Sequence, residues 1–277
     1  MVTSTITILL LSVFAGLLGS MLGLGGGIII VPVLILAFGY DIRTAVAAST
    51  VSIIATSTGA AVAYLNDHLT NTRVAMWLEM GTASGAMSGA LLAGFLAPKA
   101  LFVLFGLLMT YSAYNMFQAR KSELPPQVEP DAVSRKLQLS GTYYDQVLDR
   151  QIAYNVTRSW TGLVLMYFSG ALAGLLGIGA GVFKVLAMDQ VMKMPIKAST
   201  ATSNFMIGVT AASGAIVYFV RGDVVPSVAG PVALGVLCGA LLGTRIMVRL
   251  KGTTLRKLFI PILLVVAVQM FWKGLVG

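Results

Sequence analysis

Long apolar runs recur along this chain and leave few ways for it to fold. They cover residues 5–38, 44–64, 74–97, 100–118, 159–188, 198–220, 224–248 and 255–272. About 20 apolar residues in a helix suffice to cross a bilayer. Only 10% of the residues are charged, whereas about 25% are charged in a typical soluble domain. The sequence therefore predicts an all-α integral membrane protein in contact with the lipid bilayer.

Two glycine clusters lie 154 residues apart, at Gly23-Leu24-Gly25-Gly26-Gly27 and Gly177-Ile178-Gly179-Ala180-Gly181. The same spacing matches many other positions, among them Phe14 with Phe168, Val31 with Val185, and Tyr64 with Tyr218. After a local shift of four residues, Gly85 and Gly89 are matched with Gly235 and Gly239. The chain is thus predicted to be an internal duplication, with membrane repeats at 1–118 and 158–277 and a connector at 119–157.

The runs 5–38 and 159–188 are too long for one span, and each has a glycine cluster in its middle. If each crosses once, the chain has eight spans with parallel halves, and nine Lys and Arg face ten. If each instead enters and returns on one side, fourteen face four, with Lys184 inside the membrane. This positive-inside bias favours inverted repeats, each with a Gly-broken first segment plus three transmembrane helices. A re-entrant hairpin and two short full crossings remain equally compatible with the charges.

This topology places the connector in the cytoplasm and both termini outside. No basic residue precedes Arg43, so the N-terminal run is expected to be retained rather than removed as a signal peptide. The connector contains three prolines and mixed charges, followed by an expected amphipathic helix through Tyr143, Val147 and Ile152. We expect a solvated or membrane-surface linker, with a regulatory site as the alternative.

Non-helical backbone at membrane depth is tolerated only inside protein or beside a water-filled cavity. Glycine lets a ligand approach the amides, and helices that begin at such a turn present unpaired N–H groups and a positive dipole end. The predicted ligand is a small anion, bound at Gly25, Gly26, Gly27, Gly179, Ala180 and Gly181. The alternative is that the glycines only allow close helix packing.

Hydroxyl and amide groups follow each cluster and are candidate donors to the same anion: Ser49, Thr50, Thr202, Ser203 and Asn204. Ser49 and Ser203 occupy matching positions, as do Thr50 and Asn204. Alternatively, these side chains bond to carbonyls of their own helices.

Lys184 lies three residues after Gly181, deep within an apolar run, and its counterpart Ile30 is uncharged. A charge at that depth costs at least about 2.5–3.5 kcal/mol and usually faces a pathway or a partner. We interpret Lys184 as a counter-charge for the substrate, with snorkelling to the cytoplasmic face as the alternative. Glu79 and Asp189, near span ends, are candidates for proton or cation coupling, with an interfacial structural role as the alternative.

Other functional classes find little support in the residues. Cations between apolar runs are read as topology signals rather than as a nucleic-acid surface. The first glycine cluster has no Gly-Lys-Ser/Thr ending, which argues against nucleotide binding. With one cysteine, one histidine and few acidic residues, no metal or cofactor is expected, and an enzyme is disfavoured.

At its glycine turns the sequence resembles the sulfite exporter TauE/SafE family of bacterial and archaeal membrane permeases. The resemblance rests on 23–27 with Pro32, on 177–181, and on Ala201-Thr202-Ser203-Asn204. It implies a permease that moves small sulfur-containing anions, such as sulfite, sulfonates or related organic acids, across the cytoplasmic membrane. Leu186 stands at the position matching Pro32, and Lys184 replaces a usually apolar residue, which favours a more strongly negative substrate.

The sequence therefore predicts a secondary transporter of small sulfur-containing anions that works by alternating access, with export favoured. An anion channel of the same architecture is the alternative. The particular anion, the coupling ion and homo-oligomerisation stay open.

Overall fold

The computed structural model describes residues 2–93, 95, 97–118, 127–177 and 179–250, with scattered residues between 254 and 275. In the first half the helices are α1 (Val2–Leu22), α2 (Gly27–Leu36), α3 (Ile42–Asn66), α4 (Thr72–Ala93) and α5 (Pro98–Gln118). The connector contains α6 (Ala132–Leu137), β1 (Gly141–Asp145) and β2 (Arg150–Tyr154). The second half contains α7 (Ser159–Leu176), α8 (Gly181–Leu186), the π-helical segment η2 (Ala187–Val191), α9 (Ile196–Val220) and α10 (Pro226–Met247).

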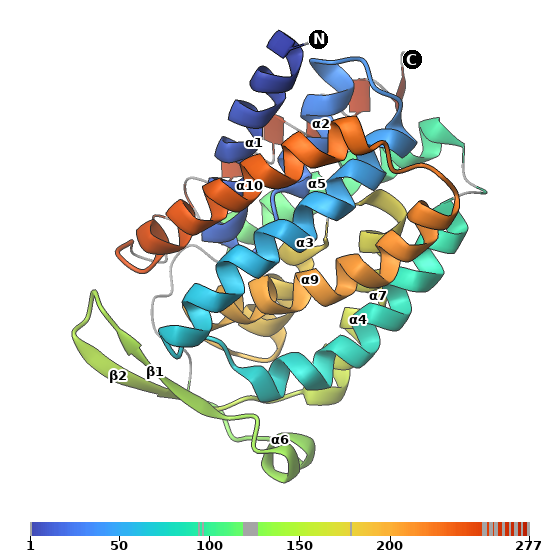
Figure 1. Ribbon diagram of the computed structural model, residues 1–277. Coiled ribbons are helices and arrows are strands. Elements are labelled where there is room, and N and C mark those ends of the chain that lie inside the picture. Colours follow the sequence, from blue (N-terminus) through green and yellow to red (C-terminus); the bar gives the residue numbers. More distant parts are fainter. Residues whose placement is uncertain are drawn as a thin grey trace.

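The helices form one bundle (Figure 1). Among the described residues, four helices are long and apolar enough to cross a membrane: α3, α7, α9 and α10. Large apolar side chains point outward, such as Met76, Trp160 and Phe219, which are 60–75% exposed. Extensive apolar exposure of this kind marks a surface that is covered by another phase or partner. The fold is that of a mostly helical integral membrane protein, as the composition predicts.

The connector differs from its prediction. Residues 141–154 form an antiparallel hairpin, β1 paired with β2, instead of an amphipathic helix. Buried residues alternate along both strands, Tyr143 and Asp145 in β1 and Ile152 and Tyr154 in β2. This two-residue period suits aromatic and β-branched side chains on a strand. The chain is therefore not entirely α-helical, and the hairpin extends from the bundle at the end opposite the start of α1 (Figure 1).

The two halves pack by exchanging partners. Helix α1 lies along α10 of the other half, and α7, its counterpart, lies along α4. A Cβ added to Gly85 would lie 2.1 Å from the carbonyl oxygen of Tyr167, and one added to Gly239 would lie 1.9 Å from that of Val13. These glycines therefore allow close packing between helices. The predicted shift of four residues is wrong, because the contacts match Gly85 with Gly239, 154 residues later, and the neighbouring glycines follow the same spacing.

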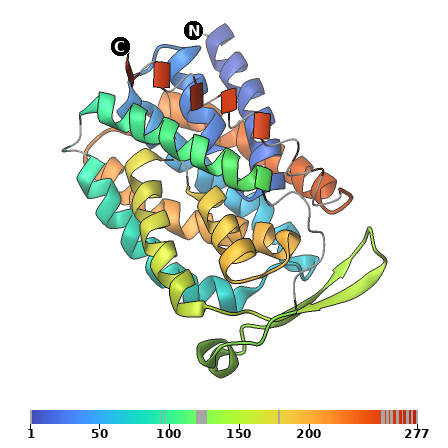
Figure 2. The ribbon, with the colours of Figure 1, turned by 180° about the vertical axis from the view of Figure 1, so that it is seen from behind.

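Helices α3 and α9 cross in opposite directions at the centre of the bundle (Figure 1). Ser57, late in α3, donates to the carbonyl of Asn204, early in α9. Ile53 and Ile207, which are 154 residues apart, share one small buried cluster. Since equivalent residues meet here, the contacts relate the halves by a local two-fold axis. Figure 2 shows α5 on the outer side of α7 and α8, where Tyr111 stacks on Phe183.

The glycine segments 23–27 and 177–181 lie against each other in opposite directions, between α3 and α9. A Cβ added to Gly181 would lie 2.0 Å from the carbonyl oxygen of Gly23, and one added to Gly27 would lie 2.9 Å from that of Gly177. The residues of these segments with positive φ, between 47° and 75°, are Gly23, Gly25, Gly26, Gly177, Gly179 and Ala180. Glycine is needed here because two backbones approach closely in left-handed conformations.

The hairpin covers one end of the bundle. Lys197, in the first turn of α9, forms a 2.9 Å ion pair with Asp145, and both side chains are at most 7% exposed. Asn71 links the same region by donating to the carbonyl of Leu139 and to the hydroxyl of Tyr154. Burial alone would raise the pKa of Asp145, but hydrogen bonds from Lys197 and from two backbone N–H groups outweigh it and lower that pKa.

The glycine contact predicts the effect of one added methyl group. Gly181→Ala should destabilise the protein by about 3 kcal/mol or more, because neither backbone can move aside easily. Gly230→Ala is the control, since the added Cβ would meet open space and alanine favours a helix by about 1 kcal/mol. Thermal unfolding in detergent measures both. Equal melting temperatures for the two variants would contradict the close backbone contact.

The Asp145–Lys197 pair predicts a pH-dependent hairpin. Asp145→Asn should cost about 3–5 kcal/mol, because it leaves a buried lysine unpaired. With the folded-state pKa lowered, the pair contributes at any pH above the ordinary aspartate value of about 3.9 and is lost as pH falls through the lower folded value. Proteolysis of the connector and thermal unfolding, from pH 8 to 3, measure this. Asp149→Asn, on the exposed turn of the hairpin, should change stability by about 0.5 kcal/mol or less; if it matched Asp145→Asn, the pair would have no special role.

Candidate functional site

Two serines tie each glycine segment to the opposite half. Ser49 of α3 donates to the carbonyl oxygen of Gly177 at 2.6 Å, and Ser203 of α9 donates to that of Gly23 at 2.7 Å. The donors are 154 residues apart, and so are the acceptors, so the two bonds are related by the local two-fold axis. Each carbonyl follows the last turn of a helix, where backbone oxygens lack intrahelical donors. In this conformation each serine hydroxyl therefore supplies the hydrogen-bond donor that the carbonyl at the helix end would otherwise lack.

The other predicted polar residues have separate partners. Thr50 donates to the carbonyl of Val46 in its own helix, which is the alternative to a role as a donor to the anion. Thr202 accepts a hydrogen bond from the backbone of Asn71, toward the hairpin. Asn204 donates to the carbonyls of Ser20 and Thr200, while its side-chain oxygen is buried without a hydrogen-bond donor among the described residues. Asn204 thus lies beside the first break and keeps one unused polar atom.

The turn residues Gly25–Gly27 and Gly179–Gly181 lie at the centre of the bundle, under two isoleucines. A Cβ added to Gly25 would lie 2.8 Å from Cδ1 of Ile207 and 2.9 Å from Cγ2 of Ile53. Ile53 also covers Gly179 at 3.2 Å from such a Cβ. The first N–H groups of α2 and α8 have no partner within their own helices. An anion could reach them only if the isoleucine side chains moved apart.

Lys184 is fully buried and paired across the two halves. Its Nζ lies 3.8 Å from Oε2 of Glu79 in α4 and also donates to the hydroxyl of Thr210 in α9. Thr210 in turn donates to Oε1 of Glu79 at 2.7 Å. Oε2 of Glu79 has no hydrogen-bond donor among the described residues. Lysine, threonine and glutamate thus form one buried network in which the carboxylate has capacity for another donor.

This network is not repeated by the two-fold axis. The positions that match Lys184, Thr210 and Glu79 are Ile30, Thr56 and Ala233. Thr56 donates to the carbonyl of Ser52 in its own helix, whereas the single hydroxyl proton of Thr210 has two acceptors within reach, the carbonyl of Met206 at 3.1 Å and the nearer Oε1 of Glu79. The hydroxyl is therefore present in both halves, whereas the ion pair occurs on one side of the axis.

The structure brings Lys184 and Glu79 together, although one was predicted from the sequence as a substrate counter-charge and the other as a coupling residue. Asp189 lies elsewhere, half-buried in the π-helical segment η2. Sequence reasoning did not single out Ile53 and Ile207 as a cover for the turns. Their equal spacing of 154 was visible, but an apolar residue in an apolar run carries no signal of its own.

Comparisons with known proteins agree with this architecture. The sequence model of one protein family, described as sulfite exporter TauE/SafE, matches residues 8–270. The chain is also similar to the probable membrane transporter protein YunE of Bacillus subtilis (strain 168), at 26% identity over 279 residues, which cover 98% of this chain and 99% of the relative. No solved structure matches the chain.

Both descriptions name transport rather than catalysis, and the family match spans both halves and the connector between them. The chain is therefore a multi-pass membrane transporter and belongs to the sulfite exporter TauE/SafE family.

Proposed function

We propose that this protein is a secondary transporter of small sulfur-containing oxyanions, such as sulfite or organosulfonates, in the cytoplasmic membrane, with export as the favoured direction. The observation that carries the proposal is the crossing of two glycine segments at the centre of the bundle. Helices begin at both segments, and their N–H groups suit an anion. The family's description names sulfite export, which supports this substrate class.

The opposed directions of α3 and α9 support inverted repeats. If equivalent helices cross the membrane in opposite directions, the halves are related by an axis in the membrane plane, as in many secondary transporters. The contact between Gly162, early in α7, and Met192, just after η2, supports a segment that enters and returns at one end. The proposed topology therefore has a cytoplasmic connector and both termini outside, which agrees with the distribution of Lys and Arg.

The cover over the glycine segments supports a carrier. Ile53 and Ile207 come from equivalent positions in the two halves and close the space between the turns. In alternating access, movement of one half against the other would separate them and admit the anion. Ser49 and Ser203 would then be released from the carbonyls, or would exchange them for the oxygens of the substrate.

The Lys184–Glu79 pair supplies a route for coupling. While Glu79 is ionised, it compensates the charge of Lys184 and competes with an anion. Once Glu79 is protonated, Lys184 carries an uncompensated positive charge that favours anion binding. Binding of the anion and of a proton would then be mutually favourable, as linkage requires. The proposed coupling ion is therefore a proton that moves together with the anion, so that export proceeds where the outward gradient of the anion exceeds the inward gradient of the proton.

The test is anion binding and flux with purified protein in proteoliposomes. We expect sulfite or a small sulfonate to raise the melting temperature and to drive saturable exchange. Lys184→Met should weaken anion affinity at least tenfold. Glu79→Gln, which resembles the protonated residue, should retain binding and remove the dependence of affinity on pH. Lys136→Ala, on the exposed connector helix, is the control and should behave as the wild type.

Three results would count against parts of this proposal. If no sulfur oxyanion stabilises the wild type, the substrate class is wrong. If Lys184→Met binds with unchanged affinity, Lys184 lies outside the site. Single-channel currents in place of saturable exchange would identify a channel.

A further inference from the structure

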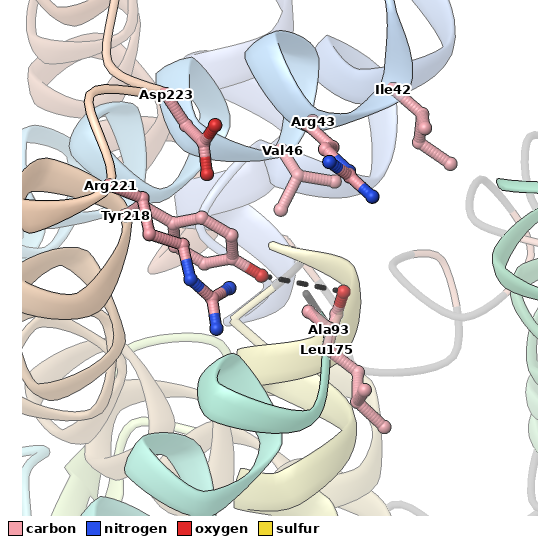
Figure 3. Close-up of a pocket in the computed structure, with 8 residues that line it drawn as sticks. All are labelled: Ile42, Arg43, Val46, Ala93, Leu175, Tyr218, Arg221 and Asp223. Atoms are coloured by element: carbon pink, nitrogen blue, oxygen red, sulfur yellow. Dashed lines mark hydrogen bonds between the residues drawn. The ribbon is translucent and has the colours of Figure 1, made fainter. Parts of the chain in front are cut away.

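A cavity of about 260 Å³ lies at one end of the bundle, where α3 begins and where α7 and α9 end (Figure 3). Its inner wall includes Val46, Leu175 and Tyr218, and its charged residues are Arg43, Arg221 and Asp223. A water molecule occupies about 30 Å³ in the liquid, so the cavity has room for a small hydrated ion. It lies where α3 begins and α9 ends, whereas the hairpin covers the region where α9 begins.

Two guanidinium groups contribute to this cavity, one from each half. Arg221 donates from Nη1 to the carbonyl of Ala90 and from Nη2 to that of Leu91, at 2.9 and 2.8 Å. Since a guanidinium has five N–H donors, three remain. The side chain of Arg43 is exposed and has no hydrogen bond or ion pair with the residues that the structure describes. Asp223 is not within ion-pairing distance of either arginine. The cavity therefore has more cationic than anionic groups and spare donors.

The local two-fold axis shows what Arg43 is suited to bind. Its counterpart, 154 residues later, is Lys197, which holds the carboxylate of Asp145 at 2.9 Å. Asp145 belongs to the connector between the repeats, and no carboxylate forms an ion pair with Arg43 among the residues that the structure describes. The same position in the repeat thus binds an oxyanion group at the hairpin end and is open to a ligand at the cavity end.

The cavity lies close to the second glycine segment, with a layer of side chains between them. Val46 packs on the second glycine segment, because a Cβ added to Gly177 would lie 2.6 Å from its Cγ1 and from its carbonyl oxygen. Leu175 lies two residues before Gly177, and Tyr218 donates to the carbonyl of Gly174 in the last turn of α7. An anion in the cavity would be separated from Gly177 by these side chains.

We propose that the cavity between Arg43 and Arg221 is an access site for a small oxyanion, on the face away from the connector. Arg43 and Arg221 bind the oxyanion through paired N–H groups, the geometry that guanidinium offers to planar or tetrahedral oxygens. The identity of the ligand as the transported sulfur oxyanion rests on the proposed function. The phosphate of a lipid headgroup shares this chemistry.

The experiment uses the full-length protein in nanodiscs of zwitterionic lipid, with calorimetric titration of sulfite, methanesulfonate and acetate. Arg43→Gln should weaken binding of at least one anion tenfold or more and raise KM for transport. Arg43→Lys, which keeps the charge but loses the paired donors, should give an intermediate affinity. Lys136→Gln, on the exposed connector helix at the opposite end, is the control and should leave this affinity unchanged. Melting temperatures confirm that each variant is folded.

The outcomes separate this inference from the proposed function. If Arg43→Gln binds and transports as the wild type while Lys184→Met does not, the access site is wrong and the transport proposal stands. If sulfur oxyanions fail to bind but acetate binding depends on Arg43, the access site stands and the substrate class is wrong. If binding of every free anion is independent of Arg43, and Arg43 changes only the effect of adding anionic lipid, the cavity is a lipid-phosphate site and the inference is overturned.

Discussion

The structure depends on one backbone contact, the crossing of the two glycine segments between α3 and α9. A Cβ on Gly181 would come within 2.0 Å of the opposite carbonyl, so this crossing can form only if the position of closest approach is glycine. Once it is in place, Ser49 and Ser203 each lie beside a carbonyl of the other half. Polar backbone deep in a membrane protein needs such partners. The crossing and the serines together make each half incomplete without the other.

A bundle with two-fold symmetry is the same at both ends unless particular residues break that symmetry. Two features do so. The Lys184–Thr210–Glu79 network has Ile30, Thr56 and Ala233 at its matching positions, so charge lies on one side of the centre. The hairpin places Asp145 on Lys197 at one end, whereas Arg43 at the other end borders a cavity. The buried charges and the cavity are therefore both placed asymmetrically, although the packing is nearly symmetric.

The sequence predicts the membrane class and the duplication well because both are expressed by many residues at once. A spacing of 154 is sustained over each repeat, and the glycine clusters stand out against apolar neighbours. The four-residue shift is wrong because it aligns the identical residues Gly-Ala-Leu-Leu of the two halves. The equivalent helix contacts are instead made by Gly85 and Gly239, which are 154 residues apart. The hairpin is not predicted because its strands have only five residues each, so the two-residue alternation is short, and one of the buried positions, Asp145, is not apolar.

The partners of the site residues were not predictable for a different reason. Lys184 and Glu79 are 105 residues apart in different halves, and only the exchange of helices between the halves brings them to 3.8 Å. A single sequence shows that each charged residue is unusual in an apolar run, but it does not show that the two residues are in contact. Ser49 and Gly177 are a similar case, although the duplication offers a rule: a contact from one half to the other is expected again at the matching positions where the residues are alike, as with Ser49–Gly177 and Ser203–Gly23.

That rule has a consequence for the proposed transport cycle. In an inverted repeat, exchanging the conformations of the two halves converts a state open at one end into a state open at the other. Applied here, the exchange would move the cavity from Arg43 to Lys197. It could do so only if Asp145 left Lys197, because the carboxylate occupies the matching place. The free-energy difference between the two states therefore includes the buried Asp145–Lys197 pair, which has no equivalent at Arg43. If the protein works by the proposed cycle, the inserted connector favours the state that is closed at the hairpin end. A substrate anion that replaced the Asp145 carboxylate at Lys197 would then lower the barrier to the other state.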